Sequence, residues 1–132
     1  MNALGIHLLI EMQDCDRVLL DDLDIVQSAM VDAALETGVA ILGRTFHKFS
    51  PQGVTGVIAI AESHLSVHTW PEYGYAAADI FTCGTSFDPH IAAKLLIERL
   101  GCKKPTVTEV RRGVLSKGPL PHKPIQQISP KS

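Results

Sequence analysis

Residues 54–83 have the sequence VTGVIAIAESHLSVHTWPEYGYAAADIFTC. Three runs within this stretch are rich in β-branched, aromatic or small apolar residues, and they predict strands at Val54–Ala61, Leu65–Trp70 and Tyr75–Thr82. The links between them are only a few residues long, too short for a crossover helix, so the strands must run antiparallel. This meander is the centre of the predicted fold.

The flanking sequence completes a single domain. Further strands are predicted at residues 4–12, 39–49 and 105–111, and two helices from the cap Asp21 to Gly38 and from the cap Asp88 to Gly101. Two helices against one antiparallel sheet predict a two-layer α+β domain over residues 1–113, with the helices on one face. Residues 114–132 hold four of the eight prolines and are expected to form a tail.

The face of the sheet away from the helices has its own pattern. In VTGVIAIA the residues of both parities are apolar or small, so the uncovered face is not made for water. An apolar face of this kind is usually an interface. We therefore expect two copies to pack sheet to sheet, giving an α/β/β/α sandwich in a homodimer.

Composition narrows the class of protein. The chain has 132 residues, 45% hydrophobic and 20% charged, which suits one globular domain. A net charge of −2 and a pI of about 6.3 give no reason to expect nucleic acid or an anionic membrane as a partner. No apolar run approaches the roughly 20 residues of a membrane span, and the N-terminus lacks a basic signal-peptide region. Three cysteines, an odd number, favour the reducing cytoplasm.

Residues 61–84 concentrate chemically active side chains: a Glu-Ser pair, two histidines, the only tryptophan, both tyrosines and a cysteine. Taken singly, a histidine on a strand or a lone cysteine is more often structural than catalytic. His64 and His68 could share a metal only on a helix, and a second cysteine-rich half-site is missing, so no metal is expected. A hydrolase triad is also disfavoured because the chain has no G-x-S-x-G motif.

The whole pattern, however, is specific. Residues 46–84, FHKFSPQGVTGVIAIAESHLSVHTWPEYGYAAADIFTCG, closely resemble the bacterial and archaeal S-adenosylmethionine decarboxylase proenzymes, which are pyruvoyl-dependent enzymes of polyamine synthesis. The resemblance extends more loosely from Gly5 to about Gly113. It implies that the chain cleaves itself between Glu62 and Ser63 into a β chain of residues 1–62 and an α chain of residues 63–132. Ser63 would become the covalent pyruvoyl cofactor, which forms a Schiff base with the substrate amine and accepts electrons during decarboxylation.

The resemblance also implies roles for other residues. His68 would be the base that removes the Cα proton of Ser63 during processing, and Thr55 would stabilise the cyclic intermediate. Cys83 would protonate the decarboxylated substrate. Two positions depart from the family pattern. Thr55 stands where serine is usual, which could slow processing, and Ile6 stands where arginine is usual, which removes any ionic role there.

The substrate implied by the resemblance is S-adenosylmethionine. Phe49 would stack on the adenine and face the sulfonium, Trp70 would extend the aromatic wall, and Glu72 would bind the ribose hydroxyls. Two alternatives remain open from the sequence: an arginine or ornithine decarboxylase on the same fold, and a non-catalytic paralogue that binds an active decarboxylase. The family further implies an (αβ)2 homodimer with two active sites at the junction between subunits.

Overall fold

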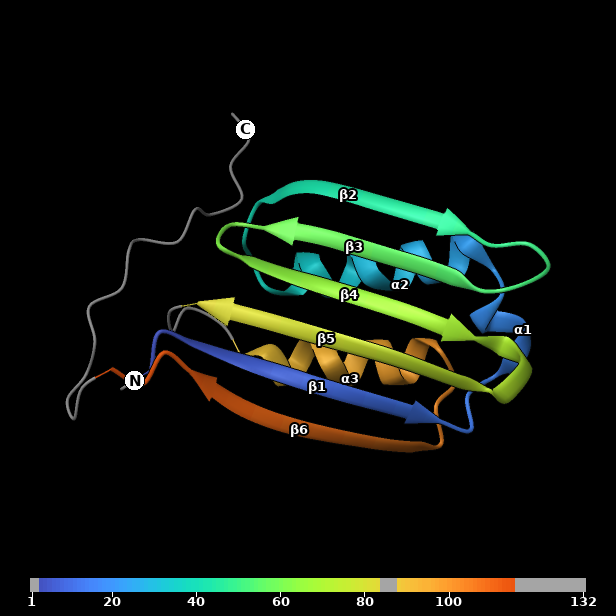
Figure 1. Ribbon diagram of the computed structural model, residues 1–132. Helices are drawn as coiled ribbons and strands as arrows, with labels where there is room; N and C mark the ends of the chain where they lie inside the picture. The colour runs from blue at the N-terminus through green and yellow to red at the C-terminus, as the bar shows by residue number, and fades with distance from the viewer. Residues whose placement is uncertain (1–2, 84–87, 116–132) are drawn as a thin grey trace.

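The computed structural model describes residues 3–83 and 88–115 (Figure 1). Within them, six antiparallel strands form one sheet in the order β2-β3-β4-β5-β1-β6. The strands are β1 (Gly5–Gln13), β2 (Ile41–Lys48), β3 (Val54–Ile60), β4 (Ser63–Trp70), β5 (Tyr75–Cys83) and β6 (Lys104–Arg112). Helices α2 (Leu23–Glu36) and α3 (Pro89–Arg99) lie behind the sheet on the same side. The predicted two-layer α+β fold is confirmed.

The predicted meander corresponds to β3–β5, and β2 extends it, so that neighbours in sequence from β2 to β5 are also neighbours in the sheet. The sequence did not indicate that β1 would lie between β5 and β6. Strand β4 begins at Ser63, two residues earlier than predicted. This shift is small, but it places the serine of the predicted cleavage site inside a strand.

The predicted cap of the first helix is wrong by one residue. Asp22 caps α2 by accepting a hydrogen bond from the Ile25 backbone N–H at 3.1 Å, and a short helix α1 (Arg17–Leu20) precedes it. Asp21 instead accepts from the Gly53 N–H at 2.9 Å and from Lys48 Nζ at 2.8 Å. These bonds lower the pKa of Asp21 from its ordinary value, with the Lys48 bond contributing most. Asp21 therefore anchors the turn between β2 and β3 rather than the helix.

The core lies between the sheet and the two long helices. Side chains at alternate positions of the central strands face the helices and are fully buried, among them Leu8, Ile10, Ile58, Leu65 and Ile80. The helices meet them with small and flexible residues such as Ala29, Met30, Ala33, Ala93 and Leu96. Because strand side chains alternate between faces, the remaining positions point to the opposite side.

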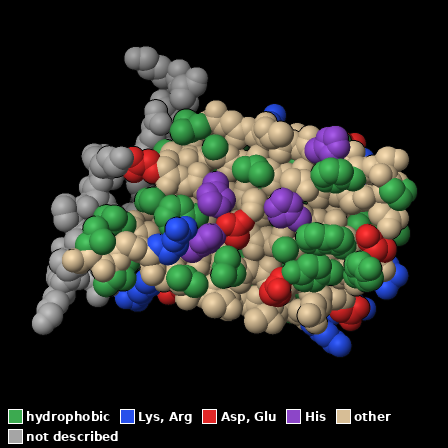
Figure 2. Space-filling model, in the orientation of Figure 1, with side chains coloured by type: hydrophobic (Ala, Val, Ile, Leu, Met, Phe, Trp, Pro, Cys, Tyr) green, Lys and Arg blue, Asp and Glu red, His purple; other side chains and the backbone are tan. Residues whose placement is uncertain are grey.

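The opposite face is not covered by either helix, as Figures 1 and 2 show. Its exposed side chains include Leu9 (44% exposed), Val57 (40%) and Val110 (39%). Histidine and acidic side chains gather near the middle of the same face (Figure 2). The predicted apolar second face is thus present, with a polar cluster set within it. We refer to it below as the open face.

The rest of the chain adds two points. No helix among the described residues is both long and apolar enough to cross a bilayer. Most of the predicted tail, residues 116–132, lies outside the described residues.

Candidate functional site

The predicted cleavage site lies in the tight turn between β3 and β4. Ile60 pairs with Ser63, which leaves only Ala61 and Glu62 in the loop. Glu62 has a φ of 58°, a left-handed conformation that costs a residue with a Cβ roughly 1 kcal/mol or more. The Glu62–Ser63 peptide bond therefore directly follows a strained residue.

Ser63 and Cys83 are neighbours across adjacent strands. The backbone N–H of Cys83 donates a hydrogen bond to Ser63 Oγ at 3.2 Å. Both residues are partly exposed at the end of the sheet where β4 begins and β5 ends. The structure thus brings together the predicted cofactor precursor and the predicted proton donor.

A polar network on the open face adjoins this pair. The Nε2 atoms of His7 and His64 lie 2.6 Å and 2.9 Å from the same oxygen of Asp79, and Ser66 donates to the other oxygen. Burial raises the pKa of Asp79, but the hydrogen bonds from Ser66, His64 and His7 outweigh it and lower the pKa below its usual value. Asp79 is therefore an anion held by three side chains from β1 and β4.

This network also offers a possible metal site. One ligand atom from each of His7, His64 and Asp79 lies within 4.8 Å of the others, and two imidazoles with a carboxylate suit a transition metal. The hydrogen bonds already satisfy both Asp79 oxygens without an ion. The sequence prediction considered only His64 with His68, and the structure shows that His64 pairs with residues from other strands instead.

The remaining predicted site residues gather at the opposite end of the sheet. Thr55 Oγ1 lies 3.1 Å from His68 Nδ1, so the hydroxyl that replaces the usual serine still reaches the histidine. The His68 ring lies 6.5 Å from the Trp70 ring, which in turn lies 5.4 Å from Tyr75. Their exposed edges form an aromatic wall beside the predicted base.

Phe49 and Glu72 lie at this same end. Phe49 follows β2, and its N–H donates to the carbonyl of Gly53, just before β3 begins. Its ring is 45% exposed and contacts the His47 ring at 4.4 Å between centroids. Glu72 lies in the short 3-10 helix η1 (Pro71–Tyr73), which links β4 to β5, and is exposed.

The two groups of predicted residues are far apart within one chain. His68 is five residues beyond Ser63 on the same strand, and at about 3.3 Å per residue that separation is roughly 16 Å. His68 therefore cannot reach the Cα proton of Ser63 in its own chain. We call Ser63 with Cys83 the serine end of the open face, and Thr55, His68, Trp70, Phe49 and Glu72 the histidine end.

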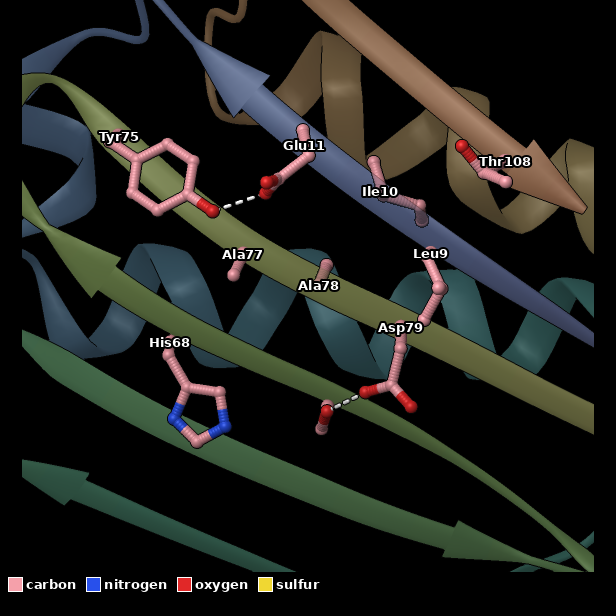
Figure 3. Close-up of a pocket in the computed structure, with 10 residues that line it drawn as sticks. Leu9, Ile10, Glu11, His68, Tyr75, Ala77, Ala78, Asp79 and Thr108 are labelled. Atoms are coloured by element: carbon pink, nitrogen blue, oxygen red, sulfur yellow. Dashed lines mark hydrogen bonds between the residues drawn. The ribbon is translucent and has the colours of Figure 1, made fainter.

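A shallow hollow of about 520 Å³ lies on the open face between these ends (Figure 3). His68 and Asp79 border it, and Tyr75 hydrogen-bonds Glu11 across it. Burial and the neighbouring Glu11 raise the pKa of Tyr75 to about 12, so the tyrosine stays a neutral donor. From β1, the apolar Leu9 lines the hollow beside the charged Glu11.

Comparison with known proteins agrees with this geometry. The model of the S-adenosylmethionine decarboxylase family matches residues 6–113. The S-adenosylmethionine decarboxylase proenzyme of Thermodesulfovibrio yellowstonii is 50% identical over 125 residues, covering 93% of each chain. That of Acetivibrio thermocellus is 53% identical over 114 residues, covering 86% of this chain and 92% of its own. The chain belongs to the S-adenosylmethionine decarboxylase family.

A solved structure supports the family fold. The crystal structure of the adenosylmethionine decarboxylase from Aquifex aeolicus superposes with a TM-score of 0.81 at 28% identity, covering 90% of this chain and 98% of that one. In this S-adenosylmethionine decarboxylase family member, Ile6 stands where arginine is usual and lies away from the predicted site residues of the open face. Ile6 packs against the core on the helix side, so its side chain does not belong to the open face.

Sequence reasoning missed part of the site in this S-adenosylmethionine decarboxylase family member. His7, Asp79 and Arg112 come from β1, β5 and β6, and the strand order that joins them was not predicted. One signal was available: His7 and Asp79 are polar residues inside otherwise apolar strands, at positions that alternate with the core.

Proposed function

We propose that the protein is a self-cleaving, pyruvoyl-dependent decarboxylase of S-adenosylmethionine, which supplies the aminopropyl donor for spermidine synthesis. The observation that carries this is the contact of Ser63 Oγ with the Cys83 N–H, directly after the left-handed residue Glu62. Membership of the family supports the same activity. We place the enzyme in the cytoplasm, as its odd number of cysteines favours.

Processing would begin with attack of Ser63 Oγ on the carbonyl carbon of Glu62. The amide becomes an ester, and the amine of Ser63 is released. A base then removes the Cα proton of Ser63, the Cα–Cβ double bond forms, and Glu62 leaves as a carboxylate. Tautomerisation and hydrolysis release ammonia and leave the pyruvoyl group. A backbone serine needs a nearby base for these steps, because a hydroxyl is a weak nucleophile at its ordinary pKa.

Ser63 fits this role by its position. It starts β4 at the end of the sheet and is partly exposed, so the new chain terminus would remain near Cys83. Once formed, the pyruvoyl group supplies an electron sink for decarboxylation of an amino acid. Cys83, whose backbone N–H contacts Ser63 Oγ, would then deliver a proton.

If His68 is the base, it would have to come from a second copy of the chain, because it lies roughly 16 Å from Ser63 in its own chain. A dyad between two open faces, running across the strands, places the serine end of one protomer over the histidine end of its partner. Each of the two sites then contains Ser63 and Cys83 from one protomer, with Thr55 and His68 from the other. Burial of Leu9, Val57 and Val110 would contribute roughly 25 cal/mol per Å² to this homodimer.

The histidine end supports the choice of substrate. Phe49 and Trp70 are large aromatics, 45% and 39% exposed, that a flat, cationic nucleoside could cover. Contacts of a sulfonium with such rings are worth about 1–2 kcal/mol when desolvated. Glu72 is exposed beside them and could accept hydrogen bonds from the ribose hydroxyls. In the proposed dimer, these residues serve the pyruvoyl of the partner.

Two measurements test the function. Denaturing mass analysis should show chains of residues 1–62 and 63–132, the second with its N-terminus blocked. Carboxyl-labelled S-adenosylmethionine should release labelled CO2, whereas labelled arginine and ornithine should not. Release from either of those amino acids instead would assign the substrate differently.

Matched variants of the two nearby serines complete the test. Ser63→Ala should remain one inactive chain. Ser66→Ala removes a hydroxyl three residues along the same strand and should still cleave. Cleavage of Ser63→Ala at the same bond would contradict the proposed chemistry.

A further inference from the structure

The side chain of Arg112 borders the serine end of the open face and has no part in the processing chemistry above. Gly5 pairs with Cys83 on one side and with Arg112 on the other, so the three positions lie in one row across β5, β1 and β6. Arg112 Cζ lies 5.2 Å from the centre of the Phe81 ring, two residues before Cys83 on the same face. Its Nη1 lies 3.5 Å from His7 Nδ1.

The position of the Phe81 ring on which Arg112 packs depends on Gly5. A Cβ at that position would lie 2.9 Å from the Phe81 ring and 2.7 Å from the Thr82 carbonyl oxygen. The missing side chain therefore lets the Phe81 ring lie against β1 and extend toward β6. Arg112 packs on that ring, and stacking of this kind leaves the edge of a guanidinium available for a planar anion.

The charges around Arg112 are also unusual. Among the described residues, no carboxylate forms an ion pair with it. The acidic group of the neighbouring network, Asp79, accepts from His7, His64 and Ser66 instead. A guanidinium that packs on an aromatic ring, with no acidic partner among residues 3–83 and 88–115, is suited to bind a carboxylate from a ligand.

We propose that Arg112 binds the α-carboxylate of the substrate amino acid. The inference rests on the proposed function, because it requires the substrate amine to be held at Ser63. In an α-amino acid the amine and the carboxylate share one carbon, so a site that holds the amine at the serine end needs a cation close by. Arg112 is such a cation, because it lies in one row with Gly5 and Cys83 across the sheet. Phe81, His7 and Gly5 act as positioning residues for it.

The chemistry of decarboxylation defines the signature. The carboxylate is an anion in the bound substrate but leaves as neutral CO2, so contact with Arg112 is strongest before the reaction. An interaction of this kind lowers KM without raising kcat. The Arg112 contact should therefore affect binding of the substrate and not binding of a molecule that lacks the carboxylate.

The test uses the processed full-length enzyme and the variant Arg112→Met, which keeps an apolar stem on the Phe81 ring. We expect KM for S-adenosylmethionine to rise about 10-fold or more, with kcat unchanged or slightly higher. The inhibition constant of the decarboxylated product amine, which has the same nucleoside and amine, should stay within about twofold. Arg111→Met is the matched control, because Arg111 lies on the helix side of the same strand, opposite Ile6.

Each outcome decides the proposal. An unchanged KM overturns it. An equal rise in KM and in the inhibition constant also overturns it, because it would show that Arg112 has a structural role and does not bind the carboxylate. If Arg112→Met does not cleave, Arg112→Lys replaces it, and a rise of about threefold in KM alone supports carboxylate binding. Failure of the wild-type chain to cleave would instead remove the proposed function, which mass analysis establishes before any kinetics.

Discussion

The serine end and the histidine end of the open face differ in how completely one chain builds them. At the serine end, polar groups find their partners within the chain: Asp79 is held by three side chains, and Ser63 Oγ accepts from the Cys83 N–H. At the histidine end, His68 has one close polar partner, Thr55, and the aromatic rings stand exposed. The polar groups of the serine end are therefore paired within one chain, whereas the aromatic rings of the histidine end remain exposed.

This difference indicates which contacts from a ligand or a second chain each end needs to form a complete site. A wall of half-exposed rings gains stability only when a ligand or another protein surface covers it. The serine end holds the proposed reactive atoms, but the proposed base His68 lies roughly 16 Å away in the same chain. Two copies related by a dyad across the strands would supply each end with what it lacks, and the following experiments test that relation.

The largest expected effect is complementation between two inactive variants. Ser63→Ala and His68→Ala should each remain uncleaved. When the two are co-expressed, half of the randomly formed dimers are mixed, and each mixed dimer has one site with both residues intact. About a quarter of the wild-type activity should return. Decarboxylation assays and mass analysis measure it.

The control pairs two residues from the same end. Ser63→Ala with Cys83→Ala should give no recovery, because Ser63 and Cys83 of one site come from one protomer. Complementation by this second pair, or none by the first, would mean that the ends do not meet between protomers.

The second prediction breaks the contact between the two faces. Val57→Asp places a charge at an exposed apolar position on β3, where burial of an unpaired carboxylate would cost several kcal/mol. We expect a monomer at micromolar concentration by sedimentation, and a chain that does not cleave. Ile91→Asp changes a more exposed apolar position on the outer side of α3 and should leave a dimer that processes normally. An active monomer of either variant would separate assembly from processing.

The fold could largely be predicted because local patterns determine it. The residues of Leu65–Trp70 alternate as in a half-buried strand, with Leu65 and Val67 in the core and Ser66 and His68 on the open face. The position of β1 between β5 and β6 could not be predicted, since long-range pairing leaves no local pattern. The cap assignment failed because Asp21 and Asp22 are adjacent and chemically equal, and only the nearby Gly53 N–H distinguishes them.

The candidate site was predictable residue by residue but not as an arrangement. The motif named Ser63, His68 and Cys83 but did not say which of them lie together within one chain. Strand geometry separates Ser63 from His68, because residues five apart in a strand are roughly 16 Å apart. The sequence did not predict a role for Arg112, because this residue becomes a neighbour of Phe81 only through the β1–β6 pairing.

The third prediction separates turnover from processing at the serine end. Cys83→Ala should still form the two chains, because the backbone N–H that contacts Ser63 remains. Decarboxylation should fall by about 100-fold or more, the usual contribution of a positioned proton donor. Mass analysis and labelled CO2 release measure the two steps separately. Loss of cleavage in this variant would assign the thiol to processing instead.

The smallest expected effect concerns the polar network beside Ser63, and is best measured in the Ser63→Ala background to keep the chain intact. Because the pKa of Asp79 is lowered in the folded protein, its ionisation stabilises the fold above the unfolded value of 3.8, and this stability is lost as the pH falls through the lower folded value. Ser66→Ala removes the first of the bonds that lower this pKa, so the free energy of unfolding should fall by about 1 kcal/mol at pH 6. The difference should shrink as the pH falls below the lowered folded pKa of Asp79, where the carboxylate is protonated in both states. Urea unfolding at the two pH values measures it, with Thr108→Ala as the control from the same hollow. A Ser66→Ala deficit that is equal at both pH values would mean that the hydroxyl stabilises the fold without acting through the Asp79 charge.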